Sequence, residues 1–227
     1  MLECKNLIKT YKTKTAVNDL SFCVNEGEVF ALLGSNGAGK TTTIKIVLGL
    51  IKANSGTVHI RDGVRIGYSP DTPYFPPFLT GYETMEYYAA VGKIPRKQRE
   101  SEITSLLELV GLSTDKIKVK NYSKGMLQRL AFAQALLGNP ELLILDEPTA
   151  GLDALGRIEI IKLIGELKKS GKTVILNSHI LSDIEQVCDR GIIMNKGVQL
   201  GIWEKNANNA GQSLQELFVE LIGGADE

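Results

Sequence analysis

The segment that most constrains this chain is Gly34–Thr41, with the sequence GSNGAGKT, which directly follows the apolar run Val29–Leu33. A short, continuous apolar run that ends in glycine is typical of a strand buried in a parallel sheet. The glycines allow the backbone to turn tightly with its N–H groups pointing inward. The pattern fits G-x-x-x-x-G-K-[ST] and therefore predicts a phosphate-binding loop, followed by a helix over Lys40–Leu50.

The positions of this loop have distinct expected roles. Its backbone would surround the phosphate oxygens, and the positive end of the following helix would add to the attraction. Lys40 would place a point charge at the β- and γ-phosphates, and Thr41 would offer a hydroxyl to Mg²⁺. Thr42 would reach the α-phosphate. The expected contacts with ATP in this segment are Gly34, Ser35, Asn36, Gly37, Ala38, Gly39, Lys40, Thr41 and Thr42.

A second pattern places two adjacent carboxylates, Asp146 and Glu147, after the apolar strand Leu142–Leu145. Ligands of α/β sheets bind at the carboxyl ends of the strands, where these side chains are expected. Asp146 suits the Mg²⁺ shell, and Glu147 is suited to act as the general base toward an attacking water. An ordinary strand end would give the same pattern, but together with the phosphate loop it predicts a P-loop nucleotide hydrolase.

Alternation of strands and helices along the rest of the chain predicts a parallel α/β sheet. Thr57–Ile60 and Arg65–Tyr68 are expected to form a short hairpin around the Asp62-Gly63 turn. The other expected strands are Leu2–Ile8, Val17–Val24 and Thr173–Asn177, with a hairpin over Gly191–Trp203 that turns at Lys196-Gly197. The other expected helices of the sheet domain are Ala154–Lys169, Leu181–Val187 and Leu214–Ile222.

Residues 70–121 differ in character, because five of the seven prolines lie between Pro70 and Pro95. We expect this stretch to begin as a loop and to continue as a helix over Glu100–Val110, stopped by Gly111, with another helix over Ser123–Leu137. The region is interpreted as a helical lobe inserted into the sheet domain. Residues 74–88 contain six of the thirteen Phe and Tyr residues, which form either the core of this lobe or a groove for a partner helix.

Composition and charge exclude some classes of protein. Lys+Arg and Asp+Glu both number 26 in 227 residues, so no basic excess supports nucleic-acid binding. No apolar run approaches the length of a membrane span, and the first residues have no apolar signal region. The three cysteines, Cys4, Cys23 and Cys188, lack metal-ligand spacing. We expect reduced thiols in a cytoplasmic protein.

Three further segments carry a resemblance to a known family. The segment Tyr122-Ser123-Lys124-Gly125-Met126 resembles the signature motif of ABC-family ATPases, usually written LSGGQ. In the same order along the chain, Gly151-Leu152-Asp153 is similar to the family's D-loop, and Asn177-Ser178-His179 is similar to its switch histidine segment. The resemblance covers essentially the whole chain. It is closest to the single-domain ATPases of ABC-2-type bacterial exporters, on the form of the signature and on the closing segment 213–221.

The resemblance implies a fold, a mechanism and partners. The fold would be a P-loop NTPase core sheet flanked by helices, with an N-terminal antiparallel β subdomain and an inserted helical subdomain. Residues 1–227 would form one ABC ATPase domain, with its core over 1–70 and 138–227 and its helical subdomain over about 71–137. A transmembrane permease would dock on the helical subdomain, and the protein would work as a cytoplasmic, peripheral subunit on the inner face of the cell membrane, in an exporter.

Two copies would sandwich two ATP molecules, each held by the phosphate loop of one copy and the signature of the other. The resemblance assigns Tyr11 to adenine stacking and His179 to the γ-phosphate. Ser123 also suits the N-cap of its helix, and both roles are compatible. The family set comprises Lys40, Glu147 and His179 as catalytic residues and Tyr11, Val17, Asp71, Ser123, Gly125 and Asp153 as nucleotide contacts, beside the phosphate loop. Thr41, Asp146 and Asp71 would serve Mg²⁺.

This sequence departs from the family at Asp71, where a glutamine is usual, and in a shortened segment between Gly56 and Tyr68. Aspartate is one methylene shorter and only accepts hydrogen bonds, so its direct contact with Mg²⁺ or water is in doubt. Two alternatives are open: a soluble ABC ATPase acting on ribosomes or DNA, and a P-loop regulator that binds nucleotide without hydrolysing it. The single set of motifs and the lack of a long heptad run disfavour the first, and Glu147 disfavours the second.

Overall fold

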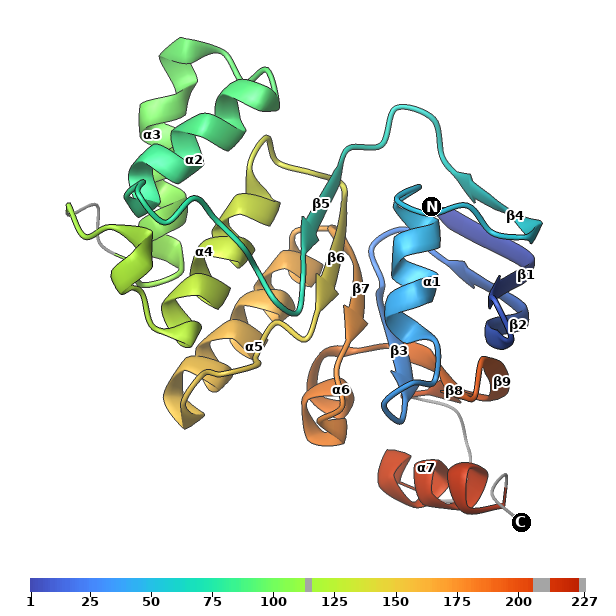
Figure 1. The fold of residues 1–227 in the computed structure, drawn as a ribbon. Helices are drawn as coiled ribbons and strands as arrows, with labels where there is room; N and C mark the ends of the chain where they lie inside the picture. The colour runs from blue at the N-terminus through green and yellow to red at the C-terminus, as the bar shows by residue number, and fades with distance from the viewer. Residues whose placement is uncertain (113–115, 206–212, 225–227) are drawn as a thin grey trace. The chain divides into compact units, whose positions relative to one another are not determined.

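The computed structural model describes residues 1–112, 116–205 and 213–224 (Figure 1). The chain divides into two compact units. Unit 1 comprises Met1–Gly63 and Leu167–Glu227, and unit 2 comprises Val64–Glu166. The expected division into a core and a helical subdomain at residues 71 and 137 stays a prediction.

Unit 1 begins with a three-stranded antiparallel sheet. Strand β1 (Leu2–Tyr11) lies in the middle and pairs with β2 (Lys14–Val24) on one side and β4 (Ser55–Ile60) on the other. Leu2, Cys4 and Leu7 are buried, whereas Glu3, Lys5 and Asn6 between them are exposed. An alternating pattern of this kind is typical of a sheet with one covered face. The N-terminal antiparallel β subdomain is therefore confirmed.

The second sheet of unit 1 places β3 (Val29–Gly34) between the parallel strands β7 (Thr173–Asn177) and β8 (Arg190–Asn195). Strand β9 (Val198–Glu204) returns antiparallel beside β8, which confirms the expected hairpin. Every residue of β3 and β7 is buried, as strands covered on both faces require. Helix α1 (Lys40–Val47) packs on β2 and β3, and α6 (Leu181–Val187) packs on α7.

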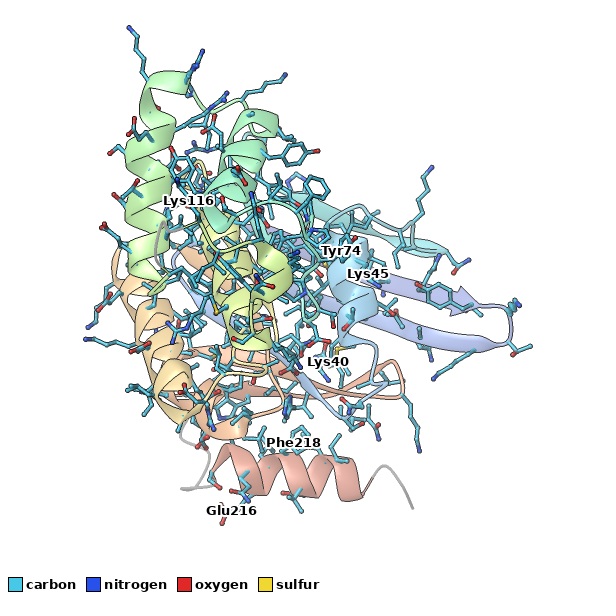
Figure 2. The ribbon with its side chains drawn as sticks, turned by 60° about the vertical axis from the view of Figure 1, so that its left-hand side comes forward. Lys40, Lys45, Tyr74, Lys116, Glu216 and Phe218 are labelled. Carbon is cyan, nitrogen blue, oxygen red and sulfur yellow. The ribbon has the colours of Figure 1, made fainter. Side chains whose placement is uncertain are left out.

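Helix α7 (Leu214–Gly223) is amphipathic and packs on β8 and β9. It begins with a capping box, in which Ser213 accepts a hydrogen bond from the Glu216 N–H and the Glu216 carboxylate accepts one from the Ser213 N–H. Figure 2 shows Phe218 on the side of α7 that faces the strands and Glu216 on the opposite side. The closing helix of the sequence prediction is thus confirmed and docked by its apolar face.

Unit 2 combines two parallel strands with a group of helices. Strands β5 (Ile66–Ser69) and β6 (Leu142–Asp146) pair directly, and α4 (Lys124–Leu136) packs on both of them. Helices α2 (Gly81–Val91) and α3 (Arg96–Leu109) pack on each other and on α4. A short 3₁₀ turn, η1, covers Val119–Asn121. Helix α5 (Ala154–Lys169) follows β6 and continues past the end of the unit.

Four expectations about elements need correction. The hairpin between β4 and β5 is wrong, because β4 pairs with β1 and β5 pairs with β6. Helix α2 was expected as loop, although Thr80 and Glu83 form a complete capping box at its start. Helix α3 begins at Arg96 rather than Glu100, directly after its N-cap residue Pro95. Helix α1 ends at Val47, before the expected Leu50.

Candidate functional site

The phosphate loop follows β3 in unit 1 and leads into α1, whose first residue is Lys40. Its backbone requires glycine at Gly39, where φ is +104° and an added Cβ would lie 2.3 Å from the Ala16 carbonyl oxygen. The N–H of Thr43 donates to the Gly39 carbonyl, and so does the Thr43 hydroxyl at 3.0 Å. The loop is therefore pressed against the first residues of β2 while the helix begins beneath it.

Lys40 lies inside this loop with only 7% of its surface exposed (Figure 2). Its ammonium donates to the Gly34 carbonyl at 2.6 Å and to the Ser35 carbonyl at 3.1 Å. A buried cation that rests on carbonyl dipoles gains strongly from a negative ligand, since the interaction is screened less than in water. The role of Lys40 as a charge for phosphate oxygens, beside the positive end of α1, stays a prediction.

The turn between β8 and β9 is hydrogen-bonded to the phosphate loop. The Gly197 N–H donates to the Ala38 carbonyl at 3.0 Å, and the Gly197 carbonyl accepts from the Asn18 N–H at 2.8 Å. Ser35 Oγ lies 3.4 Å from Asn195 Oδ1. A groove of about 510 Å³ opens here, lined by Thr13, Lys14, Thr15, Ser35, Asn36, Gly37, Asn195 and Lys196. The loop is thus bonded to a turn more than 150 residues away in the sequence.

The other expected contacts of unit 1 differ in accessibility. Tyr11, the last residue of β1, is 46% exposed, and the Lys9 ammonium lies 5.2 Å from its ring centroid. Val17 is fully buried in β2. His179 is exposed and follows β7. Because β7 runs parallel to β3 with Asn177 opposite Leu32, His179 and the phosphate loop follow strands at the same edge of the sheet.

The expected acidic residues of unit 2 follow β5 and β6. Asp146 is 1% exposed at the end of β6, and Glu147 comes next with a left-handed backbone at φ +51°. Ser69 pairs with Leu145 in the parallel register, so Asp71 follows β5 at the edge where Asp146 ends β6. Burial, then the carboxylates of Asp146 and Asp71, raise the pKa of Tyr68 to about 12. Asp71 itself is exposed.

The signature and D-loop segments contact each other within unit 2. Ser123 is the N-cap of α4 and accepts a hydrogen bond from the Met126 N–H at 3.1 Å. A Cβ added to Gly125 would lie 3.2 Å from the Gly151 carbonyl oxygen, and one added to Gly151 would lie 2.6 Å from Lys124 Cδ. Asp153 Oδ1 accepts from the Gly156 N–H at 2.8 Å. The two motifs thus form one packed surface.

Sequence reasoning missed Gln128, for which it assigned no role. The side chain of Gln128 is 1% exposed, and its Nε2 donates to the Glu147 carbonyl at 3.2 Å. The signal that could have found it is helical spacing, because Gln128, Ala131, Phe132 and Ala135 lie on one buried face of α4. A polar residue on an apolar face requires a partner, and here the partner is the residue proposed as the general base.

A family model described as ABC transporter matches residues 17–150. The chain belongs to the ABC transporter family, among its ATP-binding proteins. This ABC ATPase is 40% identical over 248 residues to an uncharacterized ABC transporter ATP-binding protein of Synechocystis sp., an alignment that covers 100% of the chain and 69% of the relative. It is 38% identical over 231 residues to the lantibiotic transport ATP-binding protein SrtF of Streptococcus pyogenes, covering 98% of the chain and 97% of the relative.

Solved structures agree with this assignment. The ABC ATPase superposes with a TM-score of 0.89 on an ATP-binding subunit of an ABC transporter that is 32% identical, over 98% of this chain and 99% of that one. It superposes with a TM-score of 0.84 on an ATP-binding cassette solved as a dimer in a post-hydrolysis state with ADP and Pi, which is 26% identical over 91% and 100% of the two chains. The fold class predicted from the sequence is confirmed, and the chain is the ATP-hydrolysing subunit of an ABC transporter.

In residues 1–112, 116–205 and 213–224, no helix combines the length and the apolar character that crossing a membrane would require. Within the same ranges, the His, Cys, Asp and Glu side chains nowhere gather in threes as a protein-only metal site would need. Magnesium that is held by one or two carboxylates plus substrate phosphates needs no such group.

Proposed function

We propose that this ABC ATPase binds MgATP between two copies and powers export through a separate membrane permease. The observation that carries the proposal is the phosphate loop. Lys40 is buried there against two backbone carbonyls, at the start of α1, and a backbone hydrogen bond from Gly197 in the β8–β9 turn holds the loop at Ala38. A tight loop with one buried cation at the start of a helix suits a polyphosphate better than a neutral ligand.

The residues take the following roles in hydrolysis. Lys40 holds the β- and γ-phosphates, and Glu147 accepts a proton from the water that attacks the γ-phosphorus, so that ADP and phosphate leave. Thr41 and Asp146 fit the Mg²⁺ that accompanies ATP, because one offers a hydroxyl on an exposed helix start and the other a buried carboxylate. When bound, Mg²⁺ would neutralise charge on the phosphates. His179 donates to the γ-phosphate.

The second copy completes the site in this proposal. Ser123 and Gly125 would meet the nucleotide held by the partner, and Asp153 would lie at the same interface. The contact of the signature with the D-loop supports this, since both motifs share one surface of unit 2. The related cassette solved as a dimer with ADP and Pi supports it further. Tyr11, exposed at the end of β1, would stack on adenine.

The permease would dock on unit 2 through its exposed aromatic side chains. Tyr74, Phe78 and Tyr87 are 83%, 70% and 55% exposed, whereas Phe75 is 5% exposed and packs edge-on against Tyr88. Three of the six rings of this stretch are therefore accessible, one is buried, and Tyr82 and Tyr88 are half-buried. Accessible apolar surface of this kind marks interaction sites. The protein would then work at the inner face of the cell membrane.

Its lantibiotic transport relative supports a peptide antibiotic as cargo.

Three variants test the hydrolytic part of the proposal. Lys40→Ala should abolish MgATP hydrolysis, and Glu147→Gln should bind ATP, fail to hydrolyse it and elute as a dimer with MgATP in size-exclusion chromatography. Lys45→Ala is the matched control, because Lys45 lies exposed on the same helix (Figure 2) and should retain wild-type turnover. Full hydrolysis by purified Lys40→Ala would refute the assignment of the phosphate loop.

A further inference from the structure

The backbone of Glu147 is held in an unusual conformation. Its φ of +51° lies in the left-handed region, which side-chain-bearing residues seldom adopt without support from their surroundings. Two groups donate to its carbonyl oxygen: the Ala150 N–H at 3.0 Å and Gln128 Nε2 at 3.2 Å. The first bond is local and closes a turn. The second comes from α4, 19 residues earlier in the chain.

The burial of Gln128 indicates that its bond to Glu147 has a function, because a buried amide is unfavourable unless it is hydrogen-bonded. Gln128 is 1% exposed, and among the described residues its Oε1 has no hydrogen-bond partner. An amide with one unsatisfied end in the interior is less favourable than an apolar side chain of the same size. The residue therefore costs stability at a place where a methionine would pack as well. Its hydrogen bond to the Glu147 carbonyl is the feature that offsets this cost.

The same helix carries the signature segment at its start. Ser123 caps α4, and Lys124 and Gly125 press against Gly151 of the D-loop. Gln128 follows Ser123 by little more than one helical turn. A rigid helix transmits displacement of its first turn to the next, so a movement of the signature surface moves the amide that holds Glu147.

We propose that Gln128 is a positioning residue, which fixes the backbone of Glu147 and couples the place of its carboxylate to the signature end of α4. The inference rests on the proposed function, in which Glu147 is the general base. Gln128 touches the Glu147 carbonyl rather than the reacting atoms, so it acts on the orientation of the base. A base that is displaced from its water slows the chemical step while leaving nucleotide binding intact.

The test distinguishes the effect of the hydrogen-bond donor of Gln128 from the effect of its side-chain volume. Gln128→Met keeps the length and volume, and removes both the donor and the unsatisfied oxygen. It should lower kcat about tenfold, which corresponds to about 1.4 kcal/mol of barrier, with the KM for ATP within about threefold. Its melting temperature should not fall by more than a few degrees, roughly the shift of 1 kcal/mol. Gln128→His returns an N–H at similar reach and should recover a large part of the lost kcat.

The matched control is Gln134→Met, on the same helix and only partly buried, which should behave as wild type. Wild-type kcat in Gln128→Met would overturn the inference. So would an equal loss in Gln128→Met and Gln128→His accompanied by a fall in melting temperature, since that marks a packing role. If Gln128→Met does not fold, Gln128→Asn, whose amide falls one methylene short, takes its place with the same expected loss.

Failure of this inference is distinguishable from failure of the proposed function. Should Glu147→Gln hydrolyse ATP at the wild-type rate, the assignment of the base is wrong whatever Gln128 does. Should Glu147→Gln be inactive while Gln128→Met is fully active, only the positioning role falls. In the Glu147→Gln background, Gln128→Met should leave the ATP-dependent dimer intact, and loss of that dimer would assign Gln128 to the interface instead of to Glu147.

Discussion

The turn behind the phosphate loop offers the sharpest test of how this site is built, because Gly197 lies outside every nucleotide motif. Its φ is +85°, and an added Cβ would lie 3.0 Å from the carbonyl carbon and oxygen of Ala16 and 3.2 Å from the Val17 nitrogen. These are backbone atoms that cannot swing aside. Gly197→Ala should therefore displace the turn away from β2 and, through its bond to Ala38, strain the loop that holds phosphate.

The magnitude follows from two contributions. Left-handed backbone costs a non-glycine residue about 1–2 kcal/mol, and overpacking against β2 adds about 1–3 kcal/mol. Gly63→Ala is the matched control, because Gly63 has a φ of +75° and no atom within 4 Å of an added Cβ. The control should show only the first contribution. The bond from the Gly197 N–H to the Ala38 carbonyl is worth about 0.5–1.5 kcal/mol, so its loss weakens ATP binding by up to about tenfold.

The assay combines urea unfolding with calorimetric titration of ATP, on both variants and the wild type. Gly63→Ala should lose stability and bind ATP as the wild type does, whereas Gly197→Ala should lose more stability and bind ATP several-fold less tightly. Equal ATP affinity in the two variants would refute the reasoning, because the β8–β9 turn would then not determine the geometry of the phosphate loop.

Three further predictions concern other parts of the molecule. Arg190→Met should lower the free energy of unfolding by about 3 kcal/mol, because the Glu28 carboxylate, bonded by Arg190 at 3.0 Å with its side chain 11% exposed, is left buried without its cation, and adding Glu28→Gln should recover much of the loss. Burial raises the pKa of Tyr68 from 10.0 to about 12, so its contribution to stability is complete below pH 10 and is lost as pH rises to about 12. Unfolding of Tyr68→Phe should therefore depend less on pH across that interval, and an unchanged pH dependence would contradict this. Asp71→Ala should retain basal hydrolysis within about tenfold, or about 1.4 kcal/mol of barrier, and complete loss would make Asp71 a catalytic residue.

The elements that the sequence predicted correctly are those specified by local patterns of residues. The strand before the phosphate loop, the loop and the start of α1 were predictable because each is specified by neighbouring residues: a β3 run that is buried throughout, glycines that permit the turn, and a helix start. The strand before Asp146 was predictable for the same reason. Motif order then supplied the family, which no single element could have supplied.

Pairing between distant segments was the part that failed. A turn at Asp62-Gly63 does not decide which strands pair, and β4 and β5 belong to different sheets. The prediction missed helix α2 for a different reason. The prolines before it indicated a loop, although Thr80 and Glu83 form a capping box that starts the helix. The importance of Gln128 was hidden because it depends on one bond to a carbonyl 19 residues away.

The capping bonds of Ser123 and Asp153 separate two residues that the sequence grouped together as nucleotide contacts. Ser123 already accepts from the Met126 N–H, but a hydroxyl keeps its own proton and can donate it to a phosphate oxygen. Asp153 is also engaged, with Oδ1 accepting from the Gly156 N–H, and an ionised carboxylate has no proton to donate. Facing a triphosphate, it would repel the ligand. The helix cap at Ser123 is therefore compatible with a phosphate oxygen as a further partner, whereas the carboxylate of Asp153 is suited to a donor group, such as an N–H or a hydroxyl.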